Sequence, residues 1–482
     1  MSETPSTAPE LKQASFVALG AAVLGAIVIP DLPAGLSVVL VATLTSVAVL
    51  IAGGRELGRF GLTAGAIAFV LMTNFLFRTA GWVLALDVLA ALGLGVVAVT
   101  RPESWREVVR AGIEALSRFP AGLGFSVRPV TGVVANVPRD RAALIGRGVL
   151  IGLAVTLVFG GLFASADQAF ASIAREAVVP SVDLGLLPVR VLVGLVVAAT
   201  TGALALLARQ PLAAGGTWAP FGPEARARRK LDPIEWLPAV VLLDAVFGLF
   251  VAVQIAVLFG DHHHVLATEG LTYAEYARQG FFQLLAVVGL TIGVIAAVVN
   301  LGDVSSPTMR RVARISLGVL AALTSVVLMS AHFRLALYED AYGLTRLRLL
   351  VHAAILWLAL VLLLVVVAGA LWRARWIPRT LLLVIAAGLL WLNAINPDAF
   401  IAKRNIDRYE ATGRIDPNYL GTLSDDAVPA LATLDEPLRS CVLGIRAART
   451  VESPSVWAFN LSRERAHAIL QPVLASRETC PK

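Results

Sequence analysis

The sequence predicts an all-α fold: a polytopic transmembrane helical bundle of about 11 spans with a small helical extracytoplasmic C-terminal domain. Three observations predict it. Of 482 residues, 57% are hydrophobic and 15% are charged, whereas roughly 25% are charged in an ordinary soluble domain. The mean hydropathy is +0.79. Apolar runs long enough to cross a bilayer recur along the chain. Together these features exclude a soluble enzyme, a disordered chain and a fibrous protein.

Each span is placed where an apolar run approaches the roughly 20 residues needed to cross the hydrocarbon core. A cytoplasmic tail at 1–13 precedes the first run, which lacks a small-residue cleavage site and is interpreted as a retained helix. The transmembrane domain covers 14–395. Its expected spans are 14–29, 34–53, 62–77, 80–100, 148–165, 187–207, 238–259, 281–299, 315–333, 347–371 and 380–395.

Lys and Arg give the expected orientation. With the N-terminus in the cytoplasm, most basic residues before the tail fall in inside segments, most densely in 101–147 and 209–230. The net charge of +7 is therefore assigned to orientation, and no nucleic-acid partner is expected. The Arg-, Ala- and Gly-rich composition is typical of a GC-rich bacterial genome. We expect a multi-pass protein of the bacterial plasma membrane, with the bilayer as its first partner and 396–482 outside.

The cytoplasmic connection 101–147 contains one amphipathic stretch. Trp105, Val108, Val109, Ile113 and Leu116 recur at helical spacing, and charged residues lie opposite them. Two interpretations fit equally well. The stretch is either an interfacial helix on the inner leaflet or a helix packed on the base of the bundle.

The tail, 396–482, is polar and helical in pattern. Asn396-Pro397-Asp398 has the residues of a helix N-terminus, and Gly413 marks the end of that helix. Ser424-Asp425-Asp426 starts another helix, and 436–450 and 462–476 are helical by pattern. We expect a small domain that docks on the outer face.

The two cysteines, Cys441 and Cys480, both lie in this tail. An extracytoplasmic location permits a disulfide between them. The alternative is two unrelated free thiols.

Polar and aromatic residues gather in outer connections. Asp261 and a run of three histidines precede a Tyr-x-Glu-Tyr-x-Arg-x-Gly-Phe-Phe string at 273–282. Thr272 and Glu275 in this segment form a capping box, which by itself requires only a helix start. Arg278 is not explained by that reading, because an arginine near hydrocarbon needs a partner or must reach the interface.

A second outer string extends the ninth span. Arg334, Tyr338 and Tyr342 fall four apart on one helical stripe, and His332 and Glu339 share another. Two interpretations remain open: a polar pocket for an anion, a headgroup or a peptide, and an ion-pair network that locks the outer loops to the tail. The candidate ligand-binding residues are Tyr273, Glu275, Tyr276, Arg278, His332, Arg334, Tyr338, Glu339, Asp340, Tyr342 and Arg346.

Both strings resemble those of a bacterial multi-pass membrane family that is still classed as a domain of unknown function. The second reads Phe-Arg-Leu-x-Leu-Tyr-x-x-Ala-Tyr-Gly-Leu-Thr-x-x-Arg at 333–348. The resemblance covers roughly residues 140–440. It implies a membrane architecture and no activity, because none is established for the family.

Polar residues inside the spans are candidates for function, and Asp87, Asp244 and His352 are the main ones. Asp244 and His352 could belong to a proton path, or each could make a single interhelical hydrogen bond. Neighbouring histidines rarely share one tetrahedral metal centre, so no metal is assigned to the histidine run. No cofactor motif is present in the sequence.

Three functions are compatible with this sequence. It favours a non-enzymatic protein whose outer pocket binds an envelope component or a membrane partner, for sensing, assembly or homeostasis. A secondary transporter using Asp244 and His352 is the alternative, and flux that is lost with Asp244→Asn would identify it. The general plan also resembles lipid-dependent glycosyltransferases acting on a lipid-linked substrate. Those enzymes carry a catalytic acid in a large first outer loop, and here that loop is short, with Asp31 as its lone acid.

Overall fold

The computed structural model describes residues 8–30, 32–53, 57–134, 186–209, 230–259, 281–371, 376–449 and 455–476. Within these ranges the chain is helical and has no β-strand, and the only bridge pairs Leu231 with Gly302. The predicted all-α class is confirmed.

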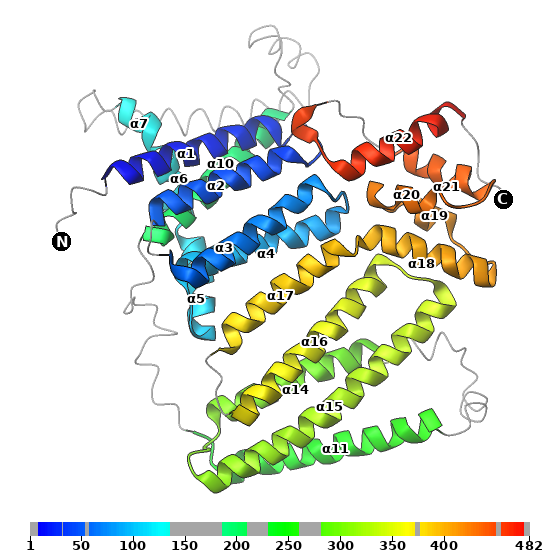
Figure 1. Ribbon diagram of the computed structural model, residues 1–482. Coiled ribbons are helices and arrows are strands. Elements are labelled where there is room, and N and C mark those ends of the chain that lie inside the picture. Colours follow the sequence, from blue (N-terminus) through cyan, green and yellow to red (C-terminus); the bar gives the residue numbers. More distant parts are fainter. Residues whose placement is uncertain are drawn as a thin grey trace. The chain divides into compact units, whose positions relative to one another are not determined.

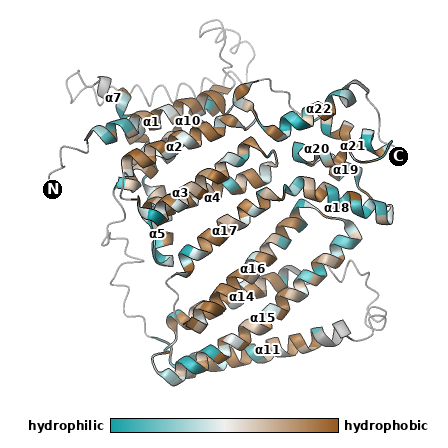
Figure 2. Ribbon diagram, in the orientation of Figure 1, coloured by the Kyte–Doolittle hydropathy of each residue, from teal (hydrophilic) through white to brown (hydrophobic). Residues whose placement is uncertain are grey.

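Ten helices in the described ranges are long and apolar enough to cross a membrane. They coincide with ten of the expected spans, and the span expected at 148–165 lies outside the described residues. Figure 2 shows apolar residues along the length of these helices. The ten are α1 (Ala8–Val28), α2 (Leu36–Gly53), α3 (Gly58–Thr73) with η2 (Asn74–Leu76), α4 (Gly81–Thr100), α10 (Leu187–Arg209), α11 (Pro233–Phe259), α14 (Phe281–Leu301), α15 (Pro307–Tyr342), α16 (Arg346–Leu371) and α17 (Ile377–Ala394).

Helix α15 is longer than a span requires. Its 36 residues rise about 54 Å at 1.5 Å per residue, well over the roughly 30 Å of the hydrocarbon core. It begins with Ser306 as N-cap, whose side chain accepts from the backbone N–H of Met309. It ends at Gly343. The stripes of the second string form the last turns of this helix, and their position beyond the bilayer stays a prediction.

The chain divides into two compact units. Unit 1 comprises Met1–Gly216, Ser424–Pro429 and Leu443–Thr479, and unit 2 comprises Thr217–Leu423, Ala430–Val442 and Cys480–Lys482. The C-terminal segment contributes to both. Its helices α18 (Pro397–Thr412) and α19 (Pro417–Leu420) belong to unit 2, whereas η4 (Asp425–Ala427), η5 (Val456–Ala458) and α22 (Leu461–Ser476) belong to unit 1. That 396–482 forms a domain of its own stays a prediction.

Unit 1 is built around α10, which packs on α1, α2 and the short helix α6 (Phe119–Ser126; Figure 1). The backbones of α6 and α10 touch. A Cβ at Gly122 would lie 2.3 Å from Ala203 N, and one at Gly202 would lie 2.0 Å from Gly122 O. Ser126 Oγ donates to Ala198 O at 2.8 Å, and Phe125 is buried among alanines of α1, α2 and α10. Small residues therefore set the distance between these helices.

The amphipathic stretch forms α5 (Trp105–Ser117). Ala111 and Ala115 are buried, and the helix packs on α4 and α10. Trp105, Val109 and Leu116 are exposed along one side. Each of the two predicted arrangements thus describes one face of α5: one face packs on the bundle, and the other presents an apolar stripe of the kind that suits an inner leaflet.

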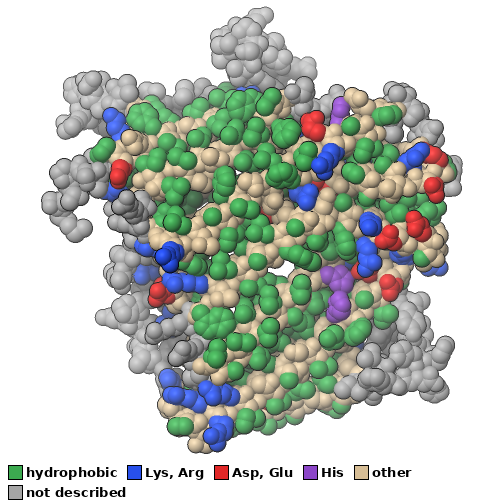
Figure 3. All heavy atoms as spheres, in the orientation of Figure 1, with side chains coloured by type: hydrophobic (Ala, Val, Ile, Leu, Met, Phe, Trp, Pro, Cys, Tyr) green, Lys and Arg blue, Asp and Glu red, His purple; other side chains and the backbone are tan. Residues whose placement is uncertain are grey.

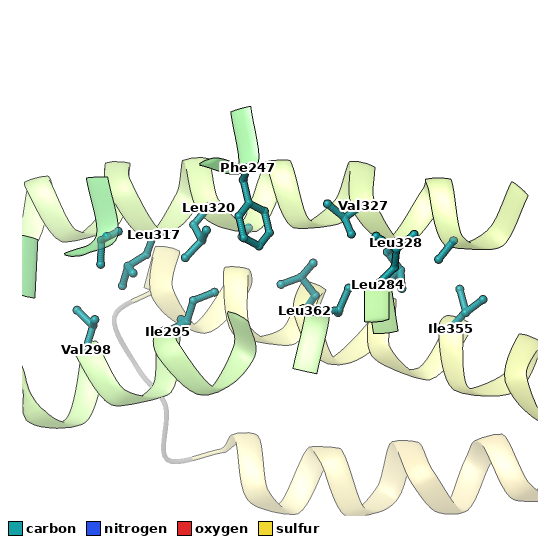
Figure 4. Packing of buried hydrophobic residues seen from close by; sticks show 14 of the residues in the cluster. Phe247, Leu284, Ile295, Val298, Leu317, Leu320, Val327, Leu328, Ile355 and Leu362 are labelled. Atoms are coloured by element: carbon teal, nitrogen blue, oxygen red, sulfur yellow. The ribbon is translucent and has the colours of Figure 1, made fainter. Parts of the chain in front are cut away.

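Unit 2 has its core where α11, α14 and α16 meet α15. Figure 4 shows Phe247 of α11 entering between Leu320 and Val327 of α15, with Ile295 and Leu362 facing them. Ser330 Oγ donates to Gln254 Oε1 at 3.0 Å, which links α15 to α11. The chain before α11 bonds with the α14–α15 turn, because Asp303 N donates to Leu231 O at 2.8 Å. These two segments therefore lie at the same end of unit 2.

We predict that Gly122→Ala destabilises the protein by about 1–3 kcal/mol, because the added Cβ overpacks a backbone contact. Gly124→Ala in the same helix is the matched control, since a Cβ there meets nothing within 4 Å. Thermal unfolding of the detergent-solubilised protein measures both. Equal melting temperatures for the two variants would contradict the close contact.

Candidate functional site

The turn between α15 and α16 is the centre of the candidate site in unit 2. Gly343 has a φ of +77°, in the left-handed region that favours glycine. A Cβ at this position would also lie 2.3 Å from Asn405 Oδ1. Glycine in the Tyr-Gly-Leu-Thr part of the second string is therefore required by both the backbone conformation and a close neighbour.

Helix α18 holds this turn through side chains. Asn405 Nδ2 donates to Leu344 O at 2.8 Å. Arg408 donates to the carbonyls of Asp340 and Ala341, at 2.9 and 2.6 Å. The last carbonyls of a helix have no partner within it. The α18 side chains satisfy carbonyls at the end of α15 and in the turn that follows it.

A buried ion pair lies next to this turn. Arg346 Nε donates to Asp398 Oδ1 at 2.9 Å, and Arg346 Nη2 pairs with Oδ2, so the contact is bidentate. The Asp398 side chain is 0% exposed, whereas that of Arg346 is 32% exposed. The backbone N–H of Arg346 donates to Tyr419 Oη at 2.8 Å. Burial raises the pKa of the Tyr419 hydroxyl, which keeps it neutral as an acceptor.

The aromatic stripe of α15 packs against Arg348. The guanidinium carbon of Arg348 lies 4.4 Å from the Tyr338 ring centroid and 5.9 Å from that of Tyr342. The two rings are 4.9 Å apart, as their shared stripe predicts. Arg348 also donates to the Gly343 carbonyl. This arginine therefore stiffens the turn by stacking and by hydrogen bonding.

Two histidines and Glu339 form a second cluster near the same end of unit 2. His352 Nε2 lies 2.9 Å from Glu339 Oε2, with 23% and 20% of the two side chains exposed. The ring of His332, an exposed residue, meets the His352 ring edge-on at 5.4 Å between centroids. Part of this cluster is accessible: His332 is an exposed residue, and the side chains of His352 and Glu339 are partly exposed.

The structure thus brings together seven of the predicted residues near the end of α15 or just beyond it. They are His332, Arg334, Tyr338, Glu339, Asp340, Tyr342 and Arg346. Tyr273, Glu275, Tyr276, Arg278 and the histidine run lie outside the described residues. Within the described ranges, no group of three His, Cys, Asp or Glu residues is arranged to hold a metal ion.

The intramembrane candidates are in three different settings. Asp87 is fully buried and accepts from Asn74 Nδ2 at 3.1 Å, which is an interhelical hydrogen bond. His352 belongs to the Glu339 cluster. Asp244 Oδ1 is buried and has no hydrogen-bond partner in the described part of the chain. The contacts of His352 are with Glu339 and His332, so a proton path joining it to Asp244 stays a prediction.

The C-terminal segment makes an equally polar contact in unit 1. Asp426 is 2% exposed, and its Oδ2 accepts from the backbone N–H groups of Thr79 and Ala80, at 2.8 Å each. Thr79 and Ala80 directly precede α4, and Asp426 N donates back to Thr79 Oγ1 at 3.2 Å. A carboxylate at a helix N-terminus is favoured by the helix dipole as well.

Asn460 acts on the same turn and is completely buried. Its Nδ2 donates to the carbonyls of Phe75 and Arg78, at 2.8 Å each. A neighbouring contact reaches the α1–α2 turn, where Leu36 N donates to Phe459 O at 3.1 Å. The C-terminal segment therefore lies at the end of unit 1 that holds the α1–α2 and α3–α4 turns.

Sequence reasoning did not identify Asp426 or Asn460 as contact residues. Asp426 is consistent with a helix start, and Asn460 has no local pattern. The available signal was two successive acidic residues, Asp425 and Asp426, before an apolar turn. Both are buried, and Asp425 pairs with Arg446 at 2.7 Å. The contacts of Asp426 and Asn460 with α3–α4 join positions more than 340 residues apart, and no spacing rule reaches that far.

Cys441 lies in α21 (Leu438–Ala447) and is 2% exposed. Cys480 lies outside the described residues. The disulfide stays a prediction.

Arg346→Ala is expected to lower the free energy of unfolding by about 3 kcal/mol, because it leaves the Asp398 carboxylate buried without its partner. Arg439→Ala is the control, since Arg439 and Glu436 form an exposed pair, at 45% and 46% side-chain exposure, and little change is expected there. Denaturant unfolding of the purified protein measures both. Similar losses in the two variants would show that the Arg346 pair is not structurally important.

Comparison with known proteins identifies a family. No curated protein and no solved structure matches the chain. A family model described as a domain of unknown function (DUF4153) matches residues 65–434. The match begins well before residue 140, the expected start of the resemblance. It includes the ends of α15, α16 and α18 that form the candidate site. The chain is a multi-pass membrane protein and belongs to the DUF4153 family.

Proposed function

We propose that this protein is a non-enzymatic component of the bacterial plasma membrane. Its extracytoplasmic cluster of His332, Glu339 and His352 binds an anionic envelope component, for sensing, assembly or homeostasis of the envelope. The single observation that carries the proposal is the accessibility of this cluster. Its neighbours Arg346, Asp398 and Arg408 are used to hold the chain together, whereas His332 is exposed and the His352–Glu339 pair is partly so.

The surroundings favour an anion. Arg348 and Arg404 both lie close enough to Glu339 to interact with it electrostatically. Imidazole N–H groups and guanidinium groups are donors that bind phosphate oxygens. Phe333 and Tyr342 are exposed nearby on α15, and aromatic side chains suit the level of lipid headgroups. Figure 3 shows histidine side chains at the surface between hydrophobic side chains and a group of Lys and Arg.

The proposed orientation places the N-terminus in the cytoplasm and the C-terminal segment outside. The distribution of Lys and Arg supports it. The contacts of the C-terminal segment support the predicted order of the spans, irrespective of which side is the cytoplasm: it contacts the α1–α2 and α3–α4 turns in unit 1 and the α15–α16 turn in unit 2. All of these turns fall outside in the predicted topology. An independent pairing, that of Leu231 with Gly302, joins two segments expected inside.

We expect His332→Ala combined with Arg404→Ala to reduce retention of phosphatidylglycerol by about 30-fold, because each removes a donor to the phosphate, worth about 1 kcal/mol net, and about 2 kcal/mol in total corresponds to that factor. Native mass spectrometry of the protein released from mixed phosphatidylglycerol–phosphatidylcholine nanodiscs measures the retention. The control is Arg465→Ala, an exposed arginine on α22 in unit 1. Retention that is unchanged in the double variant, with a normal melting temperature, would refute a headgroup site.

Labelling with a membrane-impermeant maleimide tests the orientation. A cysteine at Thr433, an exposed position of the C-terminal segment, should react in intact cells. A cysteine at Ser305, exposed in the α14–α15 turn, should react only after permeabilisation. The parent protein gives the background from Cys441 and Cys480. The reverse pattern would invert the topology and place the histidine cluster inside.

A further inference from the structure

The short helix η5 and the residue that follows it, Phe459, present an exposed apolar surface that does not belong to any of the ten spanning helices. Val456 is 74% exposed, and Trp457 and Phe459 are each 44% exposed. Between and beside them, Ala458 and Asn460 are buried. The turn therefore holds the chain by its small and polar residues and points its three large apolar side chains outward.

Hydrogen bonds fix the depth of this turn relative to the membrane helices. Leu36 N donates to Phe459 O at 3.1 Å, and Leu36 is the first residue of α2. The 18 residues of α2 rise about 27 Å, close to the roughly 30 Å of the hydrocarbon core. The beginning of α2 thus lies near the hydrocarbon boundary, and η5 lies with it.

The backbones approach so closely here that the position of η5 is tightly set. A Cβ at Gly35 would lie 2.5 Å from Phe459 O and 2.7 Å from Ala458 O. Arg463 adds a bond from its guanidinium to Ala34 O at 3.2 Å. Ala34 and Gly35 lie in the α1–α2 turn at one end of unit 1. Moving η5 far from the interface would therefore break its contacts with this turn.

We propose that η5 and the residue that follows it insert Val456, Trp457 and Phe459 into the interfacial layer of the leaflet on their side of the membrane. The partner is the phospholipid surface itself. Exposed apolar side chains of unit 1 support this choice: Val23 and Ile27 lie toward the end of α1, and Phe77, whose carbonyl accepts from Ser462 Oγ, follows η2. Trp is enriched at membrane–water interfaces, and Phe is among the apolar residues that interfacial segments bury in lipid. This contact is separate from the histidine cluster and independent of the absolute orientation.

Insertion attaches the C-terminal segment to the membrane surface, in addition to the hydrogen bonds that it makes within unit 1. Leaving three large apolar side chains in water is unfavourable, and their transfer into the headgroup–acyl boundary is favoured by the same hydrophobic effect that drives burial. Asn460 then fixes this part of the chain by hydrogen bonds, and the apolar side chains that precede it fix it by contact with lipid.

Photocrosslinking tests the proposal on the unmodified full-length protein. It is reconstituted in phosphatidylcholine–phosphatidylglycerol vesicles that contain a phospholipid with a diazirine close to the glycerol backbone, and adducts are mapped by mass spectrometry. We expect lipid adducts on the peptide covering 455–461 at a yield comparable to that of lipid-facing spanning peptides. The peptide covering 430–440, which is also part of the C-terminal segment, is the control and should stay unlabelled.

A conservative variant gives a second readout. The difference in tryptophan fluorescence between the unmodified protein and Trp457→Phe gives the emission of Trp457. We expect this emission to be quenched by lipids that are brominated high in the acyl chains. Spanning peptides that are labelled while 455–461 is not, together with an unquenched Trp457 component, would overturn the proposal.

Discussion

The structure depends on how the backbone groups of the turns between membrane helices find hydrogen-bond partners. A helix end leaves carbonyl or N–H groups without an intrahelical partner, and near hydrocarbon an unpaired group is costly. In this protein, side chains of the C-terminal segment supply the partners. Arg408 and Asn405 satisfy carbonyls at the end of α15 and in the turn after it, and Asp426 and Asn460 serve the turn before α4. The segment is thus part of the membrane architecture of both units.

This arrangement separates the residues of the second string that hold the α15–α16 turn from the partly exposed cluster around Glu339. Gly343 and Arg346 hold the turn, and Arg348 stacks on Tyr338 and bonds with the Gly343 carbonyl. These contacts fit the interpretation of an ion-pair network that locks a loop to the tail. The cluster of Glu339 with His332 and His352, two histidines that flank the string, is partly exposed. The two interpretations that the sequence leaves open therefore apply to different residues, the network to the turn after α15 and the proposed binding site to Glu339 and the flanking histidines.

The spans were predictable because the apolar runs are long and local, and α18 and its end at Gly413 were predictable from residues next to each other in sequence. The extension of α15 from the expected end at 333 to Tyr342 followed from its stripes, whereas its start at Pro307 did not. Long-range pairing was not predictable. Asp398 has the position of a first-turn acid, yet its carboxylate is buried against Arg346, 52 residues away. Asn396 has the residue type of an N-cap but makes no capping hydrogen bond. Asn460 carries no local signal at all, because its role depends on a turn formed 382 to 385 residues earlier.

Hydrogen–deuterium exchange tests the partner role of the C-terminal segment most directly, because the bonded amides report on it themselves. In Asp426→Ala, the amides of Thr79 and Ala80 should exchange about 10-fold faster or more, since a loss near 1.4 kcal/mol corresponds to one decade, while the Arg346 amide stays protected. In Tyr419→Phe, the Arg346 amide should exchange faster and those of Thr79 and Ala80 should not. This reciprocal pattern is the predicted result. Unchanged exchange in both variants, or equal acceleration at both turns in each, would contradict the account.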